Sequence, residues 1–489
     1  MAGGRGQEIS RFHEFTIPRF GHSAIRNDTG YQIPPACRKQ AWNCGFSNFV
    51  IGFPVPMLRR LLPTDLSAFR DMFASLRSRN YRIYFIGQGV SLIGTWMQTV
   101  ALSWLVYRIT GSVFLLGVIG FTSQIPTFVM APFTGVVSDR YNRLTILKLT
   151  QFFFMLQSLA MALLVLFNVV EPWHIVALSL LFGVISAFDA PARQSLVMDL
   201  IDNKEYVGNA IALNSAIFNG ARLIGPAVAG IVIAIVGEGI CFLINSVSFV
   251  AVLAALALIR ITARLETHET GDFRKSLGEG VRYTFSSVPI RTLILLLAAM
   301  SLVGMSYIVL LPAYAKEILH GGAETLGYVM SAMGAGALAG ALTMAARKSV
   351  LGLTRIIAYG IILMGLAIAL ASFSSRLYLS VIFFFFTGLS MIMAQSASNT
   401  ILQTIADEDK RGRVMSFYAM ALMGASPIGN LIAGSIASGI GVEWTMLMAG
   451  AITLLSGIWF SMNRKSLRRY IRPIYVSKGI LRSLPHDVG

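Results

Sequence analysis

The sequence predicts an all-α integral membrane protein, with twelve transmembrane helices in two six-helix pseudo-repeats. Three observations predict this fold class. Long apolar segments follow one another along most of the 489 residues. Only 13% of the residues are charged, whereas a soluble domain has about 25%. A stretch in the first half of the chain also aligns without gaps on a stretch in the second half.

The apolar segments are long enough to cross a bilayer, whose core needs about 20 apolar residues per helix. The mean hydropathy of +0.67 agrees with a membrane protein. Spans are expected at roughly residues 83–107, 113–137, 144–167, 173–196, 209–236, 240–259, 293–315, 326–345, 356–372, 377–402, 414–440 and 442–463.

The internal repeat relates the first six spans to the last six. Residues 190–230 align on residues 394–434, and Gly225 then falls opposite Gly429. Transporters built from two parallel repeats of this kind hold their substrate near the bilayer midplane, between the halves.

The repeat and the polar segments predict the domain organisation. Residues 72–259 and 292–463 form the two halves, and residues 260–291 form a cytoplasmic linker with an amphipathic helix. That helix either lies on the inner membrane surface or packs on the ends of the spans. A basic cytoplasmic tail is expected over 464–489. Residues 1–71 lack periodicity, so an over-extended start or a poorly structured extension is preferred to a folded domain.

The net charge of +17 would suggest a nucleic-acid partner in a soluble protein. Here Lys and Arg gather in short loops and tails, so positive-inside topology is the better explanation, and no nucleic acid is expected. The hairpins at 140–148 and 347–355 are basic, whereas those at Glu171 and Glu238 carry little positive charge. We therefore expect a multi-pass protein of the plasma (inner) membrane with both termini in the cytoplasm.

A charged loop between the second and third spans carries the most specific motif. It reads Gly135-xxx-Asp139-Arg140-xx-Arg143. Charge beside hydrocarbon is costly, so an acid and two arginines in a tight hairpin need a reason. Positive-inside topology accounts for the arginines but leaves Asp139 unexplained.

This loop, the two related halves and the long central linker resemble the major facilitator superfamily, and the similarity covers about residues 76–463. Shorter motifs resemble its branch of transmembrane secretion effectors, which contains the enterobactin exporter and macrolide efflux proteins. They lie at residues 94–98, 131–133, 188–194 and 219–226.

The resemblance implies a gating role for the charged loop. Asp139 would hold the inner ends of the halves together in the outward-open state, beside the start of the eleventh span near residues 411–415. Arg140 and Arg143 would pair with acids or lipid phosphates. The counterpart loop at 345–355 has no acid at this place, which makes the latch asymmetric.

The fifth span contains Gly225-Pro226-Ala227-Val228-Ala229-Gly230, which resembles the antiporter motif GPxxGG with Ala229 in place of one glycine. The proline bends the span, and the small residues allow close approach of a neighbouring helix. The motif favours export over import. Ordinary small-residue packing is the alternative interpretation.

Ionisable residues inside the spans are expensive and mark candidate coupling sites. Arg222 lies near the middle of the fifth span, on one helix face with Asn214 and Phe218. Asp189 is the nearest acid in sequence, and Arg193 follows it by one turn. Arg222 and Asp189 either border a water-filled cavity or form a structural ion pair, and Asp189 is the best-placed proton carrier.

Polar stripes without charge also run along two spans and cannot comfortably face lipid. They either line the translocation pathway or form hydrogen bonds between helices. The stripe of the first span contains Gln88, Ser91, Thr95 and Gln98, and the stripe of the tenth span contains Gln395, Asn399 and Gln403.

Together these features predict a secondary active transporter and not an enzyme. It would export a small amphiphilic molecule, drug-like or siderophore-like, by alternating access, with protons as the coupling ion. An importer or facilitator of the same fold is the first alternative. A membrane-embedded enzyme or scaffold is the second, but the spans show no convergent catalytic set. Neither a GxxxxGK[ST] motif nor metal-ligand spacing of the cysteines is present, so no ATP hydrolysis by that route, cofactor or metal is expected. A monomer is expected.

Overall fold

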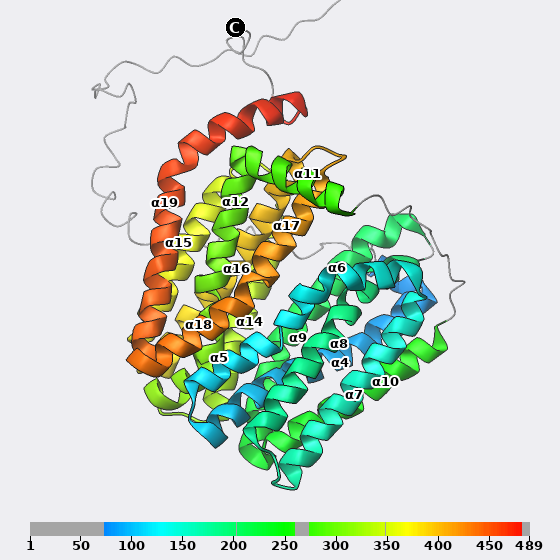
Figure 1. Ribbon diagram of the computed structural model, residues 1–489, viewed down its shortest axis with the longest axis vertical. Coiled ribbons are helices and arrows are strands. Elements are labelled where there is room, and N and C mark those ends of the chain that lie inside the picture. Colours follow the sequence, from blue (N-terminus) through cyan, green and yellow to red (C-terminus); the bar gives the residue numbers. More distant parts are fainter. Residues whose placement is uncertain (1–72, 202, 260–272, 348, 482–489) are drawn as a thin grey trace, which may run out of the picture. The chain divides into compact units, whose positions relative to one another are not determined.

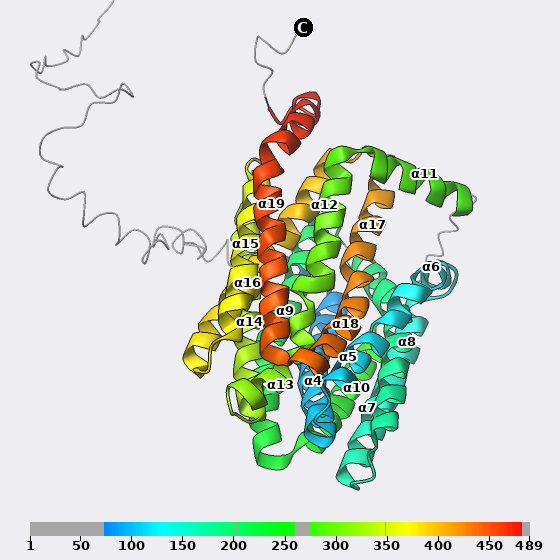
Figure 2. The same ribbon diagram turned by 60° about the vertical axis from the view of Figure 1, so that its left-hand side comes forward.

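The structure is a computed structural model that describes residues 73–201, 203–259, 273–347 and 349–481. The side chains of residues 132, 136, 139, 140, 204 and 273–277 lie outside this description. The expectation for residues 1–71 therefore falls outside the described residues. Within them, twelve helices are long and apolar enough to cross a membrane, judged by length and composition. The predicted fold class is confirmed, and Figures 1 and 2 show the helices as one bundle of two halves.

The first half begins with a short 3-10 turn, η2 (Ala74–Arg77), and has a second one, η3 (Lys204–Tyr206), before its fifth span. Its spans are α4 (Arg79–Thr110), α5 (Val113–Thr122) with α6 (Ile125–Arg140), α7 (Arg143–Leu166), α8 (Pro172–Asp199), α9 (Val207–Val236) and α10 (Glu238–Leu258).

The second half begins with α12 (Val288–Ala299), whose span continues through four shorter elements: η4 (Met300–Gly304), η5 (Ser306–Leu310), α13 (Leu311–Ala313) and η6 (Tyr314–Ile318). The remaining spans are α14 (Ala323–Ala345), α15 (Leu353–Ser372), α16 (Leu377–Ile405), α17 (Arg411–Met423) with α18 (Ala425–Ile440), and α19 (Val442–Ser477).

Three spans are interrupted, which hydropathy did not predict. The second span breaks before Pro126, at the first turn of α6, and the eleventh breaks at Gly424, shortly before Pro427. Proline has no N–H for the helical hydrogen bond, so each break falls where that bond is lost. The seventh span passes through π and 3-10 geometry between Met300 and Ile318. Such segments permit bending without loss of the span.

The last helix is longer than the hydropathy predicted. The twelfth span was expected to end near residue 463, but α19 continues to Ser477. Leu467, Ile471 and Tyr475 follow one another at four-residue intervals and are all buried. This apolar stripe packs the basic extension of α19 against the bundle, so the helix persists although its mean hydropathy falls.

The linker contains α11 (Phe273–Ser286), which contacts α12 and α17. The Tyr283 hydroxyl accepts a hydrogen bond from the Asp407 backbone N–H at 3.1 Å, and Arg413 forms an ion pair with Glu279 at 2.8 Å. Burial, ahead of the nearby Asp407 carboxylate, raises the pKa of Tyr283. Two positions were expected for this helix, on the membrane surface or on the ends of the spans. These contacts correspond to the second position.

The spans alternate in direction, which gives the bundle two distinct ends. We call the end at which α7 and α15 begin the basic end, after Arg143 and Arg355. The other, which carries Gly111, Gly237 and Gly441, is the opposite end. All three glycines have positive φ values of 59°, 84° and 88° and each ends a helix, because glycine adopts this conformation without steric cost.

The halves contact each other through α9 with α14 and α5 with α18 (Figures 1 and 2). Small residues make these crossings close: a Cβ added to Gly117 would lie 2.7 Å from the Asn430 carbonyl oxygen, and one added to Gly230 would lie 2.9 Å from that of Ala323. Both crossings lie toward the opposite end.

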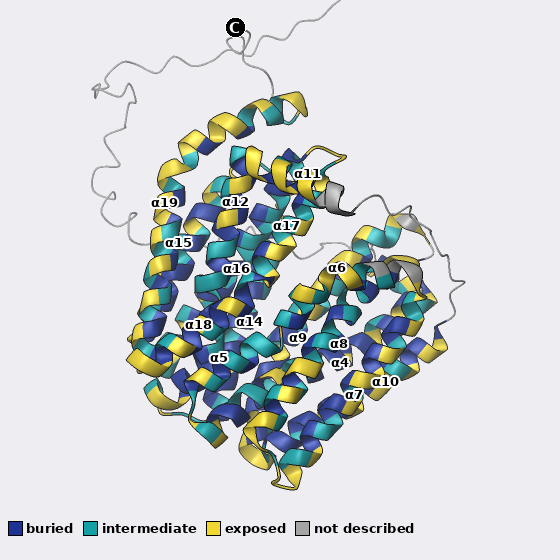
Figure 3. Cartoon of the chain, viewed as in Figure 1, coloured by how far each residue is buried: buried dark blue, intermediate teal, exposed yellow. Residues whose placement is uncertain are grey.

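Packing between the halves does not continue to the basic end. On α9, Phe218 and Ile211 extend the face that carries Arg222, and both are exposed. On α17, Met420 and Met423 extend the face of α18 that contacts α5, and both are also exposed. The halves are therefore closed at the opposite end and apart at the basic end. Figure 3 shows exposed residues along α6 and α17.

Candidate functional site

Arg222 lies where the packing between the halves ends. Its side chain is almost fully buried, with 9% of the residue surface exposed. The guanidinium carbon lies 5.5 Å from the centroid of the Trp96 ring on α4. The Trp96 ring meets the Phe218 ring edge to face at 5.9 Å. A cation over an aromatic face is stabilised by about 0.5–2 kcal/mol, more when it is desolvated.

No acid neutralises Arg222 among the described residues: none of their ion pairs includes it, and its buried Nε has no hydrogen-bond partner. The Tyr307 phenol, on η5 of the second half, is fully buried and donates to the Met333 sulfur. A buried donor without an acceptor costs about 1–3 kcal/mol, so the site favours a ligand that supplies one.

The antiporter-like motif sets the position of α9 between the halves. Gly225 faces α4, since a Cβ there would lie 2.5 Å from the Trp96 Cβ. Gly230 faces α14. Gly327 on α14 packs against the Pro226 carbonyl, since a Cβ added to Gly327 would lie 2.7 Å from that oxygen. Ala229 is fully buried. One turn nearer the basic end, the Arg222 carbonyl packs on Gly334 in the same way.

Asp189 lies on α8, and its side chain packs against α7 inside the first half. It is fully buried and accepts hydrogen bonds from Thr150 at 2.9 Å and Gln151 at 2.7 Å. Arg193, one turn along α8, forms an ion pair with it. An ion pair between Arg222 and Asp189 is not found among the described residues, because Arg193, Thr150 and Gln151 already bind the Asp189 carboxylate.

The polar stripe of α4 makes its described hydrogen bonds within the first half. Gln98 donates to Gln157 at 3.0 Å, and its carbonyl oxygen accepts from Ser158 and Asn245 at 2.7 and 2.6 Å. Gln98 thus joins α4 to α7 and α10 inside the first half, which corrects the expectation that it lines a pathway. Gln88 is buried too, and the Thr95 hydroxyl donates to the Ser91 carbonyl of its own helix.

In the polar stripe of α16, Gln395 and Asn399 are half-buried and Gln403 is exposed. Gln403 donates to the Asn399 carbonyl oxygen at 2.6 Å, and the Gln395 amide lies 3.5 Å from the Met305 sulfur. Asn214, on α9, is also half-buried. No described hydrogen bond links these side chains to Arg222, so the structure does not bring the predicted pathway residues into one bonded site.

At the charged loop, α6 ends at Arg140 and α7 begins at Arg143. Asn142 caps α7 by accepting the Leu144 and Thr145 N–H groups, and Arg143 pairs with Asp199 at 2.9 Å. The space beside Gly135 is open, since a Cβ there meets no atom within 4 Å. The side chains of Asp139 and Arg140 lie outside the described ones, so their roles remain predictions.

Sequence reasoning missed a polar closure at the opposite end. The Tyr107 hydroxyl, at the end of α4, donates to the Glu317 carboxylate on η6, and Lys316 lies 5.6 Å from the Tyr107 ring centroid. Beside it, Arg108 pairs with Glu238 at 2.6 Å within the first half. The Tyr107–Glu317 contact joins the two halves. A Lys-Glu pair at the end of an apolar span was the signal that could have found it.

Known proteins similar to this chain are transporters. The family model described as transmembrane secretion effector matches residues 70–469. The staphyloferrin A transporter of Staphylococcus aureus is 24% identical over 388 residues, which cover 78% of this chain and 96% of that protein. The multidrug efflux pump Tap of Mycolicibacterium fortuitum is 24% identical over 373 residues, which cover 75% and 91%.

Solved structures share the fold. A bacterial homologue of the human lysosomal transporter Spinster has a TM-score of 0.60 at 13% identity, covering 84% of this chain and 99% of that one. A peptide transporter of the POT family has a TM-score of 0.66 at 12% identity, covering 80% and 96%. The chain is a multi-pass membrane protein, and its family and relatives are transporters and not enzymes. It belongs to the transmembrane secretion effector family of the major facilitator superfamily.

Proposed function

We propose that this protein is a secondary active exporter of a small amphiphilic molecule, drug-like or siderophore-like, that works by alternating access against inward proton movement. One observation carries the proposal: packing between the halves runs from the opposite end to Arg222 and stops there. A carrier of two repeats exposes its midplane site to one side at a time, and this arrangement is one such state.

The basic end faces the cytoplasm in this proposal, and the protein resides in the cell membrane. The support is the excess of Lys and Arg in the loops and tail at that end. The described conformation is then open to the cytoplasm, which is the side from which an exporter takes its substrate. The antiporter-like motif of α9 supports the same direction.

Substrate would be recognised where the packing ends. Trp96 and Phe218 offer aromatic surface to an apolar group, and the unsatisfied Arg222 donor suits a carboxylate or another hydrogen-bond acceptor. An amphiphile with one acceptor group fits both. The names of the two relatives given above, a siderophore transporter and a multidrug efflux pump, are compatible with this class.

Asp189 is the proposed proton carrier. It is an acid buried within a span and is held by Arg193, Thr150 and Gln151. Protonation would remove the negative charge to which Thr150 and Gln151 of α7 donate, and a hydrogen bond to a charged group contributes about 1.5–3 kcal/mol. Proton binding would therefore loosen the contact of α7 with α8 and couple the proton to the conformational change.

The experiment that tests this function measures uptake into everted membrane vesicles that contain the full chain. A panel of siderophores, macrolides and dyes is offered, with and without a proton uncoupler. We expect uncoupler-sensitive accumulation of at least one compound, lost in Arg222→Ala. Accumulation only in right-side-out vesicles would support the importer instead, and accumulation that resists the uncoupler would remove the proton from the proposal.

Orientation is tested separately by cysteine labelling in intact cells with a membrane-impermeant reagent. A cysteine in place of Glu171 should react, whereas one in place of Ser477 should react only after permeabilisation. Both residues are exposed in the structure, so burial does not decide the outcome. The reverse pattern would place the basic end outside and contradict the proposed direction.

A further inference from the structure

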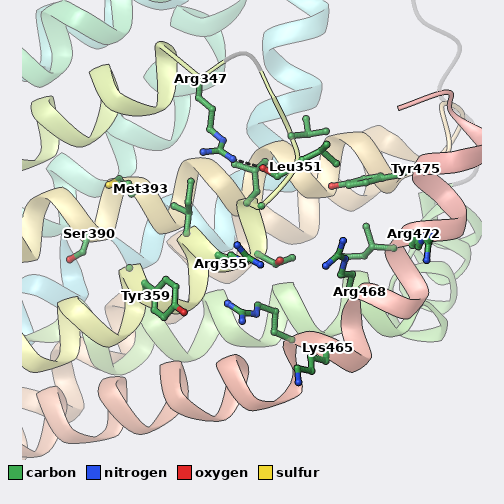
Figure 4. Close-up of a pocket in the computed structure, with 18 of the residues that line it drawn as sticks. Arg347, Leu351, Arg355, Tyr359, Ser390, Met393, Lys465, Arg468, Arg472 and Tyr475 are labelled. Carbon is green, nitrogen blue, oxygen red and sulfur yellow. Dashed lines mark hydrogen bonds between the residues drawn. The ribbon is translucent and has the colours of Figure 1, made fainter. Parts of the chain in front are cut away.

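A second feature lies away from the contact between the halves, within the basic end of the second half. A cavity of ≈ 980 Å³ is enclosed by α15, α16, the extension of α19 and the loop that joins α14 to α15. We call it the basic cavity, because it is lined by Arg347, Arg355, Arg464, Lys465, Arg468 and Arg472. Figure 4 shows Arg355 and Arg468 reaching toward the same space from α15 and α19.

Among the described lining residues there is no Asp or Glu, so the cavity itself offers no carboxylate to Arg347, Arg355, Arg464, Lys465 or Arg468. The first half is different at the same end: Arg143 has Asp199, and Arg193 has Asp189. Like charges gathered around one cavity repel one another and attract anions to it. The basic cavity therefore calls for an anionic ligand.

Two arginines are already positioned for such a ligand. Arg347 is held by its loop, donating to the carbonyl oxygens of Ser349 and Leu351. Arg464 lies 5.8 Å from the Tyr359 ring centroid, and its Nη1 is buried without a hydrogen-bond partner. A buried guanidinium donor lacking an acceptor is costly, and phosphate oxygens match the geometry of guanidinium groups well.

The walls of the cavity add an apolar component. Leu363, Leu389 and Met393 line it together with the cations. Beyond Tyr359, the same face of α15 carries the exposed Leu366 and Leu370, which face lipid in a membrane. A charged pocket that continues into a lipid-facing apolar stripe fits a headgroup with acyl chains better than it fits a free ion.

We propose that the basic cavity binds the headgroup phosphate of an anionic phospholipid, whose acyl chains lie along α15 and α16. Basic pockets between transmembrane helices are suited to such headgroups. The bound lipid would neutralise the cavity, satisfy Arg464 and fasten the extension of α19 to the bundle. The site is independent of transport direction and of the substrate.

The test uses the purified full chain in detergent, with phosphatidylglycerol or phosphatidylcholine added. Lipid retention is counted by native mass spectrometry, and the Tm is measured at each lipid concentration. The variant Arg464→Gln/Arg468→Gln removes two cavity cations, and Arg464→Lys/Arg468→Lys keeps their charge. Arg469→Gln is the matched control, because Arg469 is exposed on the same helix and does not line the cavity.

We expect phosphatidylglycerol to be retained and to raise the Tm of the wild type, with little effect of phosphatidylcholine. The double glutamine variant should need roughly tenfold to thirtyfold more phosphatidylglycerol for the same shift. The lysine variant should lie between, and Arg469→Gln should match the wild type.

Each of the following results would overturn the proposal. Equal effects of the two lipids would show that no headgroup is recognised. An equal loss in Arg469→Gln would show a diffuse surface charge instead of a cavity site. An equal Tm shift with inorganic phosphate or pyrophosphate, without lipid retention, would identify a free-phosphate site. If the double variant fails to fold, Arg355→Gln takes its place, since Arg355 lines the cavity from α15. An unchanged lipid response of that variant would also contradict the proposal.

Discussion

At the opposite end of the bundle, polar and close contacts cross between the halves, whereas the ion pairs at the basic end stay within one half or join it to the linker helix. Tyr107 reaches Glu317 across the interface. Arg143 and Arg413, by contrast, pair with Asp199 and Glu279, on α8 of the first half and on α11. A change of access must therefore break contacts at the opposite end, but it can leave the pairs at the basic end intact.

The largest effect is expected from substitution of Arg222, which lies at the boundary between the packed and the separated regions. Arg222→Ala should reduce transport by at least about tenfold, because the Trp96 site loses its cation and the substrate its donor. Arg222→Lys should be partly active, since an ammonium lacks the planar fork. Vesicle uptake at matched protein levels measures both. Asn219→Ala on the same helix is the control, and full activity of Arg222→Ala would remove Arg222 from the site.

The substitution Gly230→Ala tests whether the α9–α14 crossing keeps the opposite end closed. The new Cβ would lie 2.9 Å from the Ala323 carbonyl oxygen and 3.2 Å from the Gly327 Cα, so α9 and α14 must separate. Overpacking of this kind costs about 1–3 kcal/mol. A cysteine at the buried Ala437 of α18 should then react faster with a thiol reagent. Gly220→Ala on the same helix meets no atom within 4 Å and should change nothing. Equal labelling in both variants would show that the crossing does not hold that end closed.

Tyr107→Phe sharpens the comparison by removing one hydrogen bond and keeping the ring. A hydrogen bond to a charged group contributes about 1.5 kcal/mol, so the closed opposite end should lose roughly tenfold in relative population. Labelling of the same cysteine at Ala437 reports the change. Tyr378→Phe, at an exposed tyrosine, is the control. An unchanged labelling rate in Tyr107→Phe would mean that Glu317 does not latch the halves.

The prediction with the lowest minimum effect concerns the basic end in the alternative, outward-open state. Asp139→Asn keeps the shape of the loop acid and removes its charge. An acid near a helix N-terminus contributes about 0.3–2 kcal/mol, so the outward-open state should become roughly twofold to thirtyfold rarer. The accessibility of a cysteine at the exposed Ser416 measures it. Unchanged accessibility together with weaker substrate affinity would assign Asp139 to the binding site.

Much of the fold followed from local sequence properties. Twelve apolar segments of sufficient length fixed the spans, and the internal repeat fixed their division into halves, because both depend only on the order of residues. The interruptions at Pro126 and Gly424 were harder to predict, since neither residue type always breaks a membrane span. The continuation of α19 depends on Leu467, Ile471 and Tyr475, which hydropathy averaging hides among basic residues.

The site was predicted less completely than the fold. A polar stripe on a helix shows that the residues avoid lipid, but it does not identify the neighbouring helix that they face. The pattern therefore places Gln98 either on a pathway or between helices, and its contacts with Gln157, Ser158 and Asn245 select the second alternative. The Lys316-Glu317 pair marks a polar end of an apolar span, but Tyr107 lies 210 positions from Glu317, so no local pattern identifies it as the partner. Arg193 lies one turn from Asp189, and this pair is one that helical spacing can indicate.

The central claim is that the two ends open and close reciprocally during transport. It is tested most directly by spin-label distances in the reconstituted full chain, with one pair at Tyr141 and Ser416 near the basic end and another at Phe114 and Ser438 near the opposite end. All four residues are exposed in the structure. On addition of a transported substrate and a proton gradient, the first distance should shorten while the second lengthens. Distances that both stay constant, or that change in the same direction, would contradict alternating access in this protein.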